Sequence, residues 1–222
     1  MQINNDTEEF LRGKRISNGH FFFVPKSEVI SRDALLLKLV YEKNALHLGC
    51  ADHPDLIDSK RLSGRYLHEN LKKYASKLVG VDINQDALKK MAKIGINDLY
   101  TPDFIPDLNF DMVLAPDVIE HVPNVYEFLV GLRRYNAPEI VITTPNALRL
   151  RNRSLFRGEL INTDHRYWFT PYTLAKVCVE AGYEINAMWY TDKLRLLQPI
   201  KSASKLQFPV CRDGLAICIN PA

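Results

Sequence analysis

The chain has 222 residues, 46% of them hydrophobic, which suits one domain, or one domain with additions, around its own core. Its formal net charge of +3 is mild, and no run of five or six lysines and arginines occurs, so a nucleic-acid groove is permitted but not indicated. The N-terminus lacks an apolar signal core, no apolar run approaches the roughly 18 residues of a membrane span, and the cysteines form no C-x-x-C pair. These features favour a cytoplasmic protein.

Residues 1–32 are predicted to be an N-terminal extension or lid, in which the aromatic stretch "GHFFFVPK" packs or covers a site. Residues 33–222 are predicted to form the main domain, because apolar, β-branched runs alternate there with helical patterns. This alternation indicates parallel strands with crossover helices, an α/β fold. The predicted strands lie in "NALHLG" (44–49), "KLVGVD" (77–82), "DLYTPD" (98–103), "FDMVLA" (110–115) and "EIVITT" (139–144).

Two helices are predicted between these strands. In "GRYLHENLKKYASKL" (64–78) one apolar face would contain Leu67, Leu71, Tyr74 and Leu78. In "NQDALKKMAKIG" (84–95) the inward residues would be Leu88, Met91 and Ala92, and Gly95 would end the helix.

A further helix is predicted in "FTPYTLAKVCVEAGY" (169–183). Thr170 can cap its start, Pro171 suits the first helical position, and Gly182 can leave it with a positive φ. The segments "EINAMWYT" (184–191) and "GLAICIN" (214–220) then predict two closing strands, about seven in all, with 191–213 as a long connection.

The loop after the first strand, "LHLGCAD", suggests the ligand. In an open α/β sheet, ligands bind beyond the carboxyl ends of the strands. Only Gly49 matches a dinucleotide fingerprint, which disfavours a nicotinamide or flavin cofactor. A ligand with adenosine and no phosphates still needs a close turn and an acidic residue for the ribose, and Asp82 in "GVDIN" is placed for that role. S-adenosylmethionine (SAM) is such a ligand.

The elements "LHLGCAD", "GVDIN", "FDMVLAPDVIEHV" and "ITTPN" resemble, in order and spacing, the successive motifs of class I SAM-dependent methyltransferases of types 11 and 23. The resemblance covers about residues 44–190 and implies a Rossmann-like, seven-stranded, mostly parallel sheet with helices on both faces. It places Gly49 against the methionine portion, Asp82 on the ribose, Asp103 near the adenine amino group, and Asp117 facing the donor pocket. The predicted cofactor-binding residues are His47, Gly49, Cys50, Ala51, Asp82, Ile83, Asp103, Phe104 and Asp117.

The chain departs from the family pattern at three points. His47 stands where the family usually has an acidic residue, the loop around Gly49 contains fewer glycines, and "HPDLIDSKRLSGRYLHENL" (53–71) lengthens the span to Asp82. The methionine end of the donor site is therefore the least defined by sequence.

A cluster of acidic and histidine residues follows the fourth strand. Asp117, Glu120 and His121 have the spacing D-x-x-E-H, and if a helix begins there they share one face. His165, in "TDHRYWFT", lies on a loop at the same end of the sheet. Glu120, His121 and His165 could therefore surround one cation.

Similar elements occur in the small-RNA 3′-terminal 2′-O-methyltransferases and the ubiquinone-biosynthesis O-methyltransferases, which use a divalent cation. By this resemblance Glu120, His121 and His165 are catalytic and metal-binding residues, with Asp117 in place of a family glutamate. Magnesium prefers oxygen ligands, whereas imidazole suits zinc, iron or nickel. The alternative is metal-free, with Glu120 and His121 organising a helix start and His165 as a general base or loop anchor. A neutral histidine can take the acceptor proton, and His121 and His165 are the candidates.

Two neighbouring stretches each have two possible interpretations. Tyr167, Trp168 and Phe169 either stack on an acceptor or belong to the core, and "RLRNRSLFR" (149–157) is expected to be a solvated loop rather than a phosphate site.

The sequence thus predicts a SAM-dependent O-methyltransferase acting on a hydroxyl of a sugar or related small molecule, in glycan or secondary-metabolite biosynthesis. RNA 2′-O-methylation, methylation of a quinone precursor and a non-catalytic SAM-binding regulatory or partner subunit are the alternatives. The sequence leaves the oligomeric state open.

Overall fold

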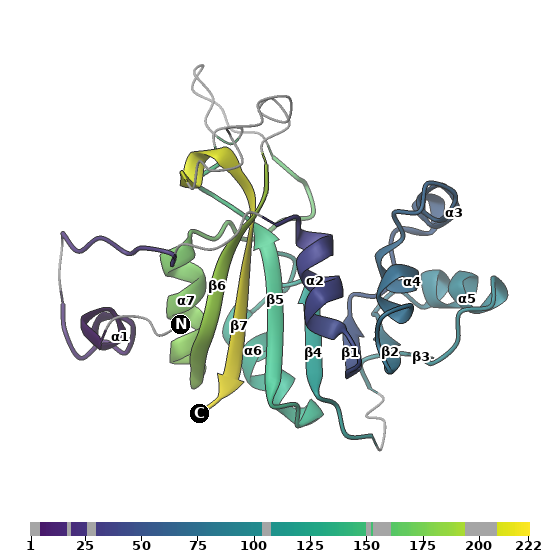
Figure 1. Cartoon of the computed structure of the whole chain (residues 1–222), viewed down its shortest axis with the longest axis horizontal. Coiled ribbons are helices and arrows are strands. Elements are labelled where there is room, and N and C mark those ends of the chain that lie inside the picture. Colours follow the sequence, from purple (N-terminus) through teal and green to yellow (C-terminus); the bar gives the residue numbers. More distant parts are fainter. Residues whose placement is uncertain are drawn as a thin grey trace. The chain divides into compact units, whose positions relative to one another are not determined.

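The computed structural model describes residues 5–16, 19–25, 30–103, 108–149, 152, 161–193 and 208–222. Within them lies a seven-stranded sheet with the hydrogen-bonded order β3-β2-β1-β4-β5-β7-β6 (Figure 1). β1 is parallel to β2 and β4, and β2 is parallel to β3, whereas β6 and β7 pair antiparallel. The predicted α/β architecture and number of strands are confirmed. The strands are β1 Asn44–Leu48, β2 Lys77–Val81, β3 Leu99–Tyr100, β4 Met112–Pro116, β5 Glu139–Pro145, β6 Tyr183–Lys193 and β7 Arg212–Pro221.

The chain divides into two compact units. Unit 1 comprises Met1–Arg32, Asp117–Gly131 and Ile142–Ala222, and unit 2 comprises Asp33–Pro116 and Leu132–Val141. No helix in the described part of the chain is long and apolar enough to cross a membrane.

The helices of unit 2 alternate along the chain with the largely buried strands β1, β2 and β4. They are α2 Arg32–Val40, which starts at the last residue of unit 1's first segment, α3 Pro54–Leu62, α4 Leu67–Lys72, α5 Gln85–Lys93 and the 3₁₀ helix η1 Leu132–Tyr135. Ile57 of α3 and Met91 of α5 are fully buried in a shared core cluster. Asn84 caps α5 by accepting a hydrogen bond from the Ala87 N–H at 3.0 Å, and Gly95 follows with φ +86°, as predicted.

Two predicted helical faces in unit 2 are partly wrong. The helix predicted over 64–78 ends at Lys72, Tyr74 is 46% exposed, and Leu78 belongs to β2. The chain turns because the Ser76 N–H donates to the Lys43 carbonyl at 3.0 Å, leading it into the sheet. In α5 the inward alanine is Ala87, since Ala92 is exposed.

Gly80, in the middle of β2, allows three neighbours to approach the strand. A Cβ at this position would lie 2.7 Å from Leu99 Cδ2, 2.8 Å from Cys50 Sγ and 2.9 Å from His68 Cε1. We therefore expect Gly80→Ala to lower the free energy of unfolding by about 1–3 kcal/mol, measured by urea denaturation. Gly131→Ala is the matched control, because its Cβ would meet nothing within 4 Å. Equal stability of the two variants would contradict this prediction.

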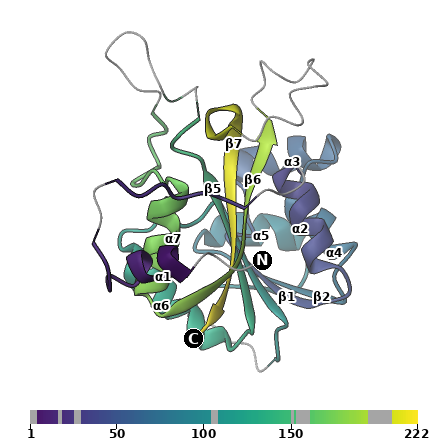
Figure 2. The ribbon, with the colours of Figure 1, turned by 60° about the vertical axis from the view of Figure 1, so that its left-hand side comes forward.

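Unit 1 contains the helices α1 Asn5–Leu11, α6 Val125–Gly131 and α7 Pro171–Glu180 and the short 3₁₀ helix η5 Pro209–Cys211. Figure 2 shows α1 beside α7, and contacts between these helices and between α6 and α7 hold this part together. Thr170 and Thr173 form a capping box at the start of α7, and Gly182 follows the helix with φ +81°. The predicted boundaries of this helix are confirmed.

Two further strand predictions need correction. The strand expected over 98–103 is only the two-residue β3, and Phe104 lies outside the described residues. The connection expected over 191–213 is shorter, because residues up to Lys193 belong to β6 and those from Arg212 belong to β7. Positions 194–207 of this connection are also outside the described residues.

Candidate functional site

The loop after β1, in unit 2, makes a close turn at Gly49. Gly49 has φ +67°, a conformation that glycine adopts without strain, and its N–H donates to the Val81 carbonyl at 2.9 Å. The N–H of Cys50 donates to the same carbonyl at 3.3 Å. The ends of β1 and β2 are thereby held together at the edge where an open α/β sheet binds its ligands.

Asp82, the residue after β2, ties the two loops together. Its Oδ2 accepts a hydrogen bond from the Ala51 N–H at 2.9 Å, and its Oδ1 accepts one from the Asn84 N–H at 2.8 Å. Burial raises the pKa of Asp82, and these backbone hydrogen bonds oppose that shift. A carboxylate offers about four lone-pair sites, so each oxygen can accept a further hydroxyl donor.

The other predicted donor-site residues of unit 2 differ in exposure. Cys50 is 3% exposed and belongs to the core cluster, where burial raises the pKa of its thiol. Ile83 is 84% exposed, and Asp103 is exposed in the turn that follows β3. The structure thus brings Gly49, Ala51 and Asp82 together and leaves Ile83 and Asp103 at the surface of unit 2.

His47 is buried beneath the loop rather than exposed on it. It is 1% exposed, and its ring stacks on that of His68 with centroids 5.3 Å apart. The two Nδ1 atoms lie 3.1 Å apart, so one of them must carry the proton that the other accepts. Burial, followed by Lys72, lowers the pKa of His68 to about 4.

This histidine pair should make the protein sensitive to acid. A histidine whose pKa falls from 6.5 to about 4 on folding binds its proton better in the unfolded chain. Stability present above about pH 6.5 is therefore lost as the pH falls toward 4, by about 3 kcal/mol in total. The free energy of unfolding is measured by urea titration at several pH values across this range. His68→Phe should make it less dependent on pH, whereas exposed His53→Gln should not. An unchanged slope in His68→Phe would contradict the prediction.

In unit 1, Asp117 follows β4 in a strained conformation. It has φ +53°, its N–H donates to the Thr143 carbonyl at 2.9 Å, and its Oδ1 accepts from the Thr143 hydroxyl at 2.8 Å. Its Oδ2 forms an ion pair with the Arg32 guanidinium. Arg32 is also held by its backbone, because its N–H donates to Asp192 Oδ2 at 3.1 Å. Sequence reasoning missed Arg32, which lies 85 residues from Asp117.

The D-x-x-E-H segment is a turn and not the predicted helix start. α6 begins only at Val125, and the His121 N–H donates to the Val118 carbonyl at 3.0 Å. The positive φ of Asp117 is incompatible with continuous right-handed helix at that residue. The shared helical face for Asp117, Glu120 and His121 is therefore wrong.

Glu120, His121 and His165 nevertheless meet. One potential ligand atom from each lies within 4.8 Å of the others. Glu120 is 1% exposed, and neither of its oxygens has a hydrogen bond of ordinary geometry from the described residues. Burial, followed by the Asp117 carboxylate, raises the pKa of Glu120 to about 8, while the nearby Thr144 hydroxyl and Arg32 lower it to a lesser extent. A buried carboxylate of this kind is costly unless a cation or proton joins it.

The loop that carries His165 is fastened to the Glu120 turn by its backbone. The Arg166 and Tyr167 N–H groups both donate to the Glu120 carbonyl, at 2.8 and 3.3 Å, and the Tyr167 hydroxyl donates to the Pro123 carbonyl at 2.9 Å. His121 Nδ1 lies 2.9 Å from the Asp164 carbonyl oxygen, which can only accept. The Nδ1 of His121 therefore carries a proton, and in the neutral ring Nε2 is the free acceptor.

His165 has a different tautomer. The Asp164 N–H donates to Asn162 Oδ1 at 3.2 Å, which directs Asn162 Nδ2 to His165 Nε2 at 2.9 Å. The neutral ring then carries its proton on Nδ1, which is buried without a partner in the described part of the chain. Burial and the neighbouring His121 lower the pKa of His165. Cation binding at Nδ1 would require the other tautomer and a rotated Asn162 amide.

Asn146, from the "TTPN" element, has a structural role that the sequence alone did not define. It is fully buried, its Nδ2 donates to the carbonyls of Pro209 and Arg212 at 2.8 and 3.0 Å, and its Oδ1 accepts from the Leu148 N–H at 3.0 Å. Asn146 thus joins the end of β5 to the start of β7. These hydrogen bonds explain the asparagine of the "TTPN" element.

The aromatic residues after His165 divide between core and surface. Phe169 is 4% exposed and belongs to the core, whereas Tyr167 is 37% exposed. Trp168 lies between His165 and Arg149, with ring centroids 5.1 Å apart on one side and the guanidinium 5.2 Å from its ring on the other. Most of the basic stretch 149–157 lies outside the described residues.

A family model described as a methyltransferase domain matches residues 20–187, more than half of the chain. No curated protein matches the chain. The fold is similar to solved SAM-dependent methyltransferases from Archaeoglobus fulgidus (TM-score 0.58, 18% identity, 85% of this chain and 92% of that one) and Mesorhizobium loti (0.54, 14%, 85% and 97%). It is also similar to the small RNA methyltransferase HEN1 (0.59, 17%, 92% of this chain and 27% of that one). At these identities the similarity establishes a shared Rossmann-like fold.

Proposed function

The chain belongs to the methyltransferase domain family, and from this premise we propose that it is a SAM-dependent O-methyltransferase with a cation site formed by Glu120, His121 and His165. The acceptor we propose is a hydroxyl of a sugar or related small molecule. The observation that carries the proposal is the buried Glu120 carboxylate beside two imidazoles, with ligand atoms within 4.8 Å of one another. One anionic oxygen and two nitrogens are a donor set that suits a divalent metal.

The residues of unit 2 fit the donor. Gly49 provides the close turn after β1, and Asp82 provides a carboxylate fixed by two backbone N–H groups with acceptor capacity left for two ribose hydroxyls. SAM supplies an electrophilic methyl group on a sulfonium, so the protein needs only to orient the acceptor and remove its proton. Asp103, exposed near the same edge, is the proposed adenine contact.

The residues of unit 1 fit the acceptor half of the reaction. A bound divalent cation would lower the pKa of a nearby hydroxyl. Glu120 would hold the cation through its carboxylate, and His121 through Nε2, whose availability follows from the bond between Nδ1 and the Asp164 carbonyl. Without a cation, the same Nε2 of His121 is the best placed proton acceptor of the cluster, because its tautomer is already fixed.

RNA 2′-O-methylation is the second candidate. The similarity to the small RNA methyltransferase HEN1, over 92% of this chain, favours it, and a ribose hydroxyl is also a sugar hydroxyl. The mild charge favours the small acceptor, because an RNA enzyme should show a basic track and steep salt dependence.

Transfer of tritiated methyl from SAM into fractionated cell extract tests the proposal. RNA, lipid, glycan and small-molecule fractions are each incubated with the protein, with EDTA alone and with EDTA plus excess Mg²⁺, Mn²⁺ or Zn²⁺. We expect label in the glycan or small-molecule fraction, at least about tenfold lower with EDTA and restored by one metal. Alkali-stable label would distinguish an ether from an ester.

The other outcomes discriminate between the alternatives. Label in RNA that is lost on ribonuclease treatment would replace the small acceptor by RNA, and label in lipid would support a quinone precursor. Activity indifferent to EDTA would reject the cation site and leave His121 as base. No transfer by protein that binds S-adenosylhomocysteine would support a binding subunit.

A further inference from the structure

A cavity of about 560 Å³ lies in unit 1 between the N-terminal segment and α7. Lys176 of α7 fixes the segment here, because its Nζ donates to the Leu11 carbonyl at 2.7 Å. The volume is within the usual range for small-molecule sites, roughly 300–1,000 Å³. The lining residues are Phe10, Gly13, Arg15, Ile16, His20, Phe21, Phe22, Tyr172 and Lys176.

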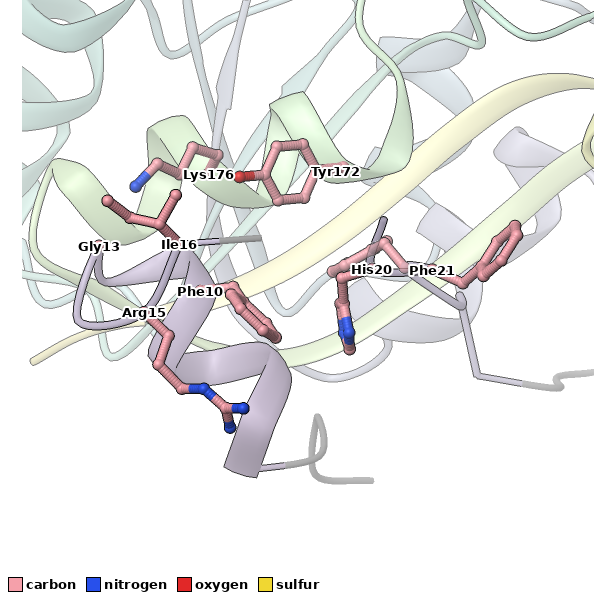
Figure 3. A pocket seen from close by; sticks show the side chains of 9 residues that line it. Phe10, Gly13, Arg15, Ile16, His20, Phe21, Tyr172 and Lys176 are labelled. Atoms are coloured by element: carbon pink, nitrogen blue, oxygen red, sulfur yellow. The ribbon is translucent and has the colours of Figure 1, made fainter. Parts of the chain in front are cut away.

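The walls of this cavity are aromatic. Figure 3 shows Tyr172 projecting from α7 and Phe10, from α1, on the other side. Phe22 meets Tyr172 edge to face with centroids 5.9 Å apart, and Phe10 lies against His20 at 4.3 Å. These pairs hold the walls in place. Phe21 stacks on Phe23 with ring centroids 6.1 Å apart but remains 78% exposed, so the other face of its ring is open to a ligand.

The charge of the lining has one sign. Arg15, His20 and Lys176 contribute basic groups, and the lining contains no acidic residue among the described residues. Arg15 lies over the Phe10 ring, 5.2 Å from its centroid, and forms an ion pair with exposed Glu9 at 3.7 Å. Lys176 is paired with Glu180 at 3.0 Å, and Glu180 does not line the cavity. An anion with a flat ring is complementary to such a lining.

We propose that this cavity binds a nucleotide, with the base against the aromatic walls and the phosphate at Arg15. Bases stack readily on exposed aromatic rings, and the planar guanidinium of an arginine can bind a phosphate through two N–H groups. The nucleotide is either free or the terminal unit of a single-stranded RNA, which share this chemistry. The site contains none of the residues assigned to methyl transfer, so it does not depend on the proposed reaction.

Isothermal titration calorimetry with AMP tests the proposal, in saturating S-adenosylhomocysteine so that the donor site cannot take up the adenosine moiety. We expect saturable binding with a Kd below about 1 mM. Phe21→Ala should weaken it roughly tenfold, as stacking energies imply. Arg15→Gln should weaken it several-fold and lower the salt slope by about one. The matched controls are Phe208→Ala, which removes another exposed ring, and Lys14→Gln, which removes a basic neighbour outside the lining.

A series of ligands separates the contribution of the ring to binding from that of the phosphate. AMP should bind more tightly than adenosine, which lacks the charge, and than inorganic phosphate, which lacks the ring. A 5′-phosphorylated single-stranded octanucleotide that binds at least tenfold more tightly than AMP would identify an RNA end as the source, and equal affinity would identify the free nucleotide.

Three results would overturn the proposal. They are the absence of saturable AMP and oligonucleotide binding, binding that Phe21→Ala and Arg15→Gln leave unchanged, and binding to phosphatidylserine vesicles alone. Because the readout is binding without turnover, a failed methyl-transfer assay would not affect the result.

Discussion

Replacing Glu120 with glutamine should strongly reduce methyl transfer and, at the same time, stabilise the protein at alkaline pH. The substitution keeps the shape of the side chain but removes the one anionic group of the cluster, and we expect a loss of activity of about 10²–10³-fold. In the folded protein the pKa of Glu120 is raised from 4.5 to about 8, so the folded state holds its proton more tightly than the unfolded state. Stability that this carboxyl provides below pH 4.5 is therefore lost as the pH rises toward 8.

Glutamine does not titrate, so the variant should escape this loss. In metal-free buffer the two proteins should be equally stable near pH 5, and the variant should be more stable by about 1–3 kcal/mol near pH 8. Excess divalent metal should stabilise only the wild type. Urea denaturation at both pH values measures the difference, and Glu127→Gln on the surface of α6 is the matched control. A variant that keeps its activity, or whose stability differs equally at both pH values, would exclude this role for Glu120.

Replacing Asp82 with alanine should weaken binding of S-adenosylhomocysteine by about 10²-fold or more. The carboxylate is the proposed partner of two ribose hydroxyls, and hydrogen bonds to a charged group contribute roughly 1.5–3 kcal/mol each. The same oxygens accept the N–H groups of Ala51 and Asn84 at 2.9 and 2.8 Å. The variant should therefore also lose about 1–3 kcal/mol of stability, because two N–H groups lose their acceptor.

Two variants separate these effects. Asp82→Asn keeps the shape but places a donor against one of the N–H groups, so it should lose both stability and affinity. Asp86→Asn, at an exposed position in the first turn of α5, should lose neither. Calorimetry with S-adenosylhomocysteine and thermal unfolding are measured on the same samples. Unchanged affinity in Asp82→Asn would remove Asp82 from the donor site.

The strands and the last helix were predictable because their signals are local. Alternating segments of β-branched residues identified the central strands, and Thr170, Pro171 and Gly182 marked the ends of α7 through caps that each depend on one residue's chemistry. The helix predicted over 64–78 was too long, because the spacing of apolar residues does not show where a helix ends and the next strand begins. Leu78 satisfies the helical spacing but is buried in β2.

The residues of the Glu120, His121 and His165 cluster could be predicted from the sequence, but their geometry could not. The D-x-x-E-H spacing suits a helix, but Asp117 adopts φ +53°. No local sequence pattern predicts a positive φ at this aspartate. The cluster forms instead because the loop around His165 bonds to the Glu120 carbonyl. Such contacts depend on tertiary structure, as does the ion pair between Arg32 and Asp117. The sequence therefore identifies these residues but not the tertiary contacts that bring them together.

The ion pair between Arg32 and Asp117 affects which acceptors we expect the proposed cation site to favour. Asp117 is paired with Arg32, so Glu120 is the one carboxylate that the cluster of described residues offers to a cation. One carboxylate cannot cancel a doubly charged metal ion, so the occupied cluster would retain positive charge. Such a charge stabilises an alkoxide and repels an ammonium group. Protonated amines should therefore be poor acceptors for this protein and alcohols good ones.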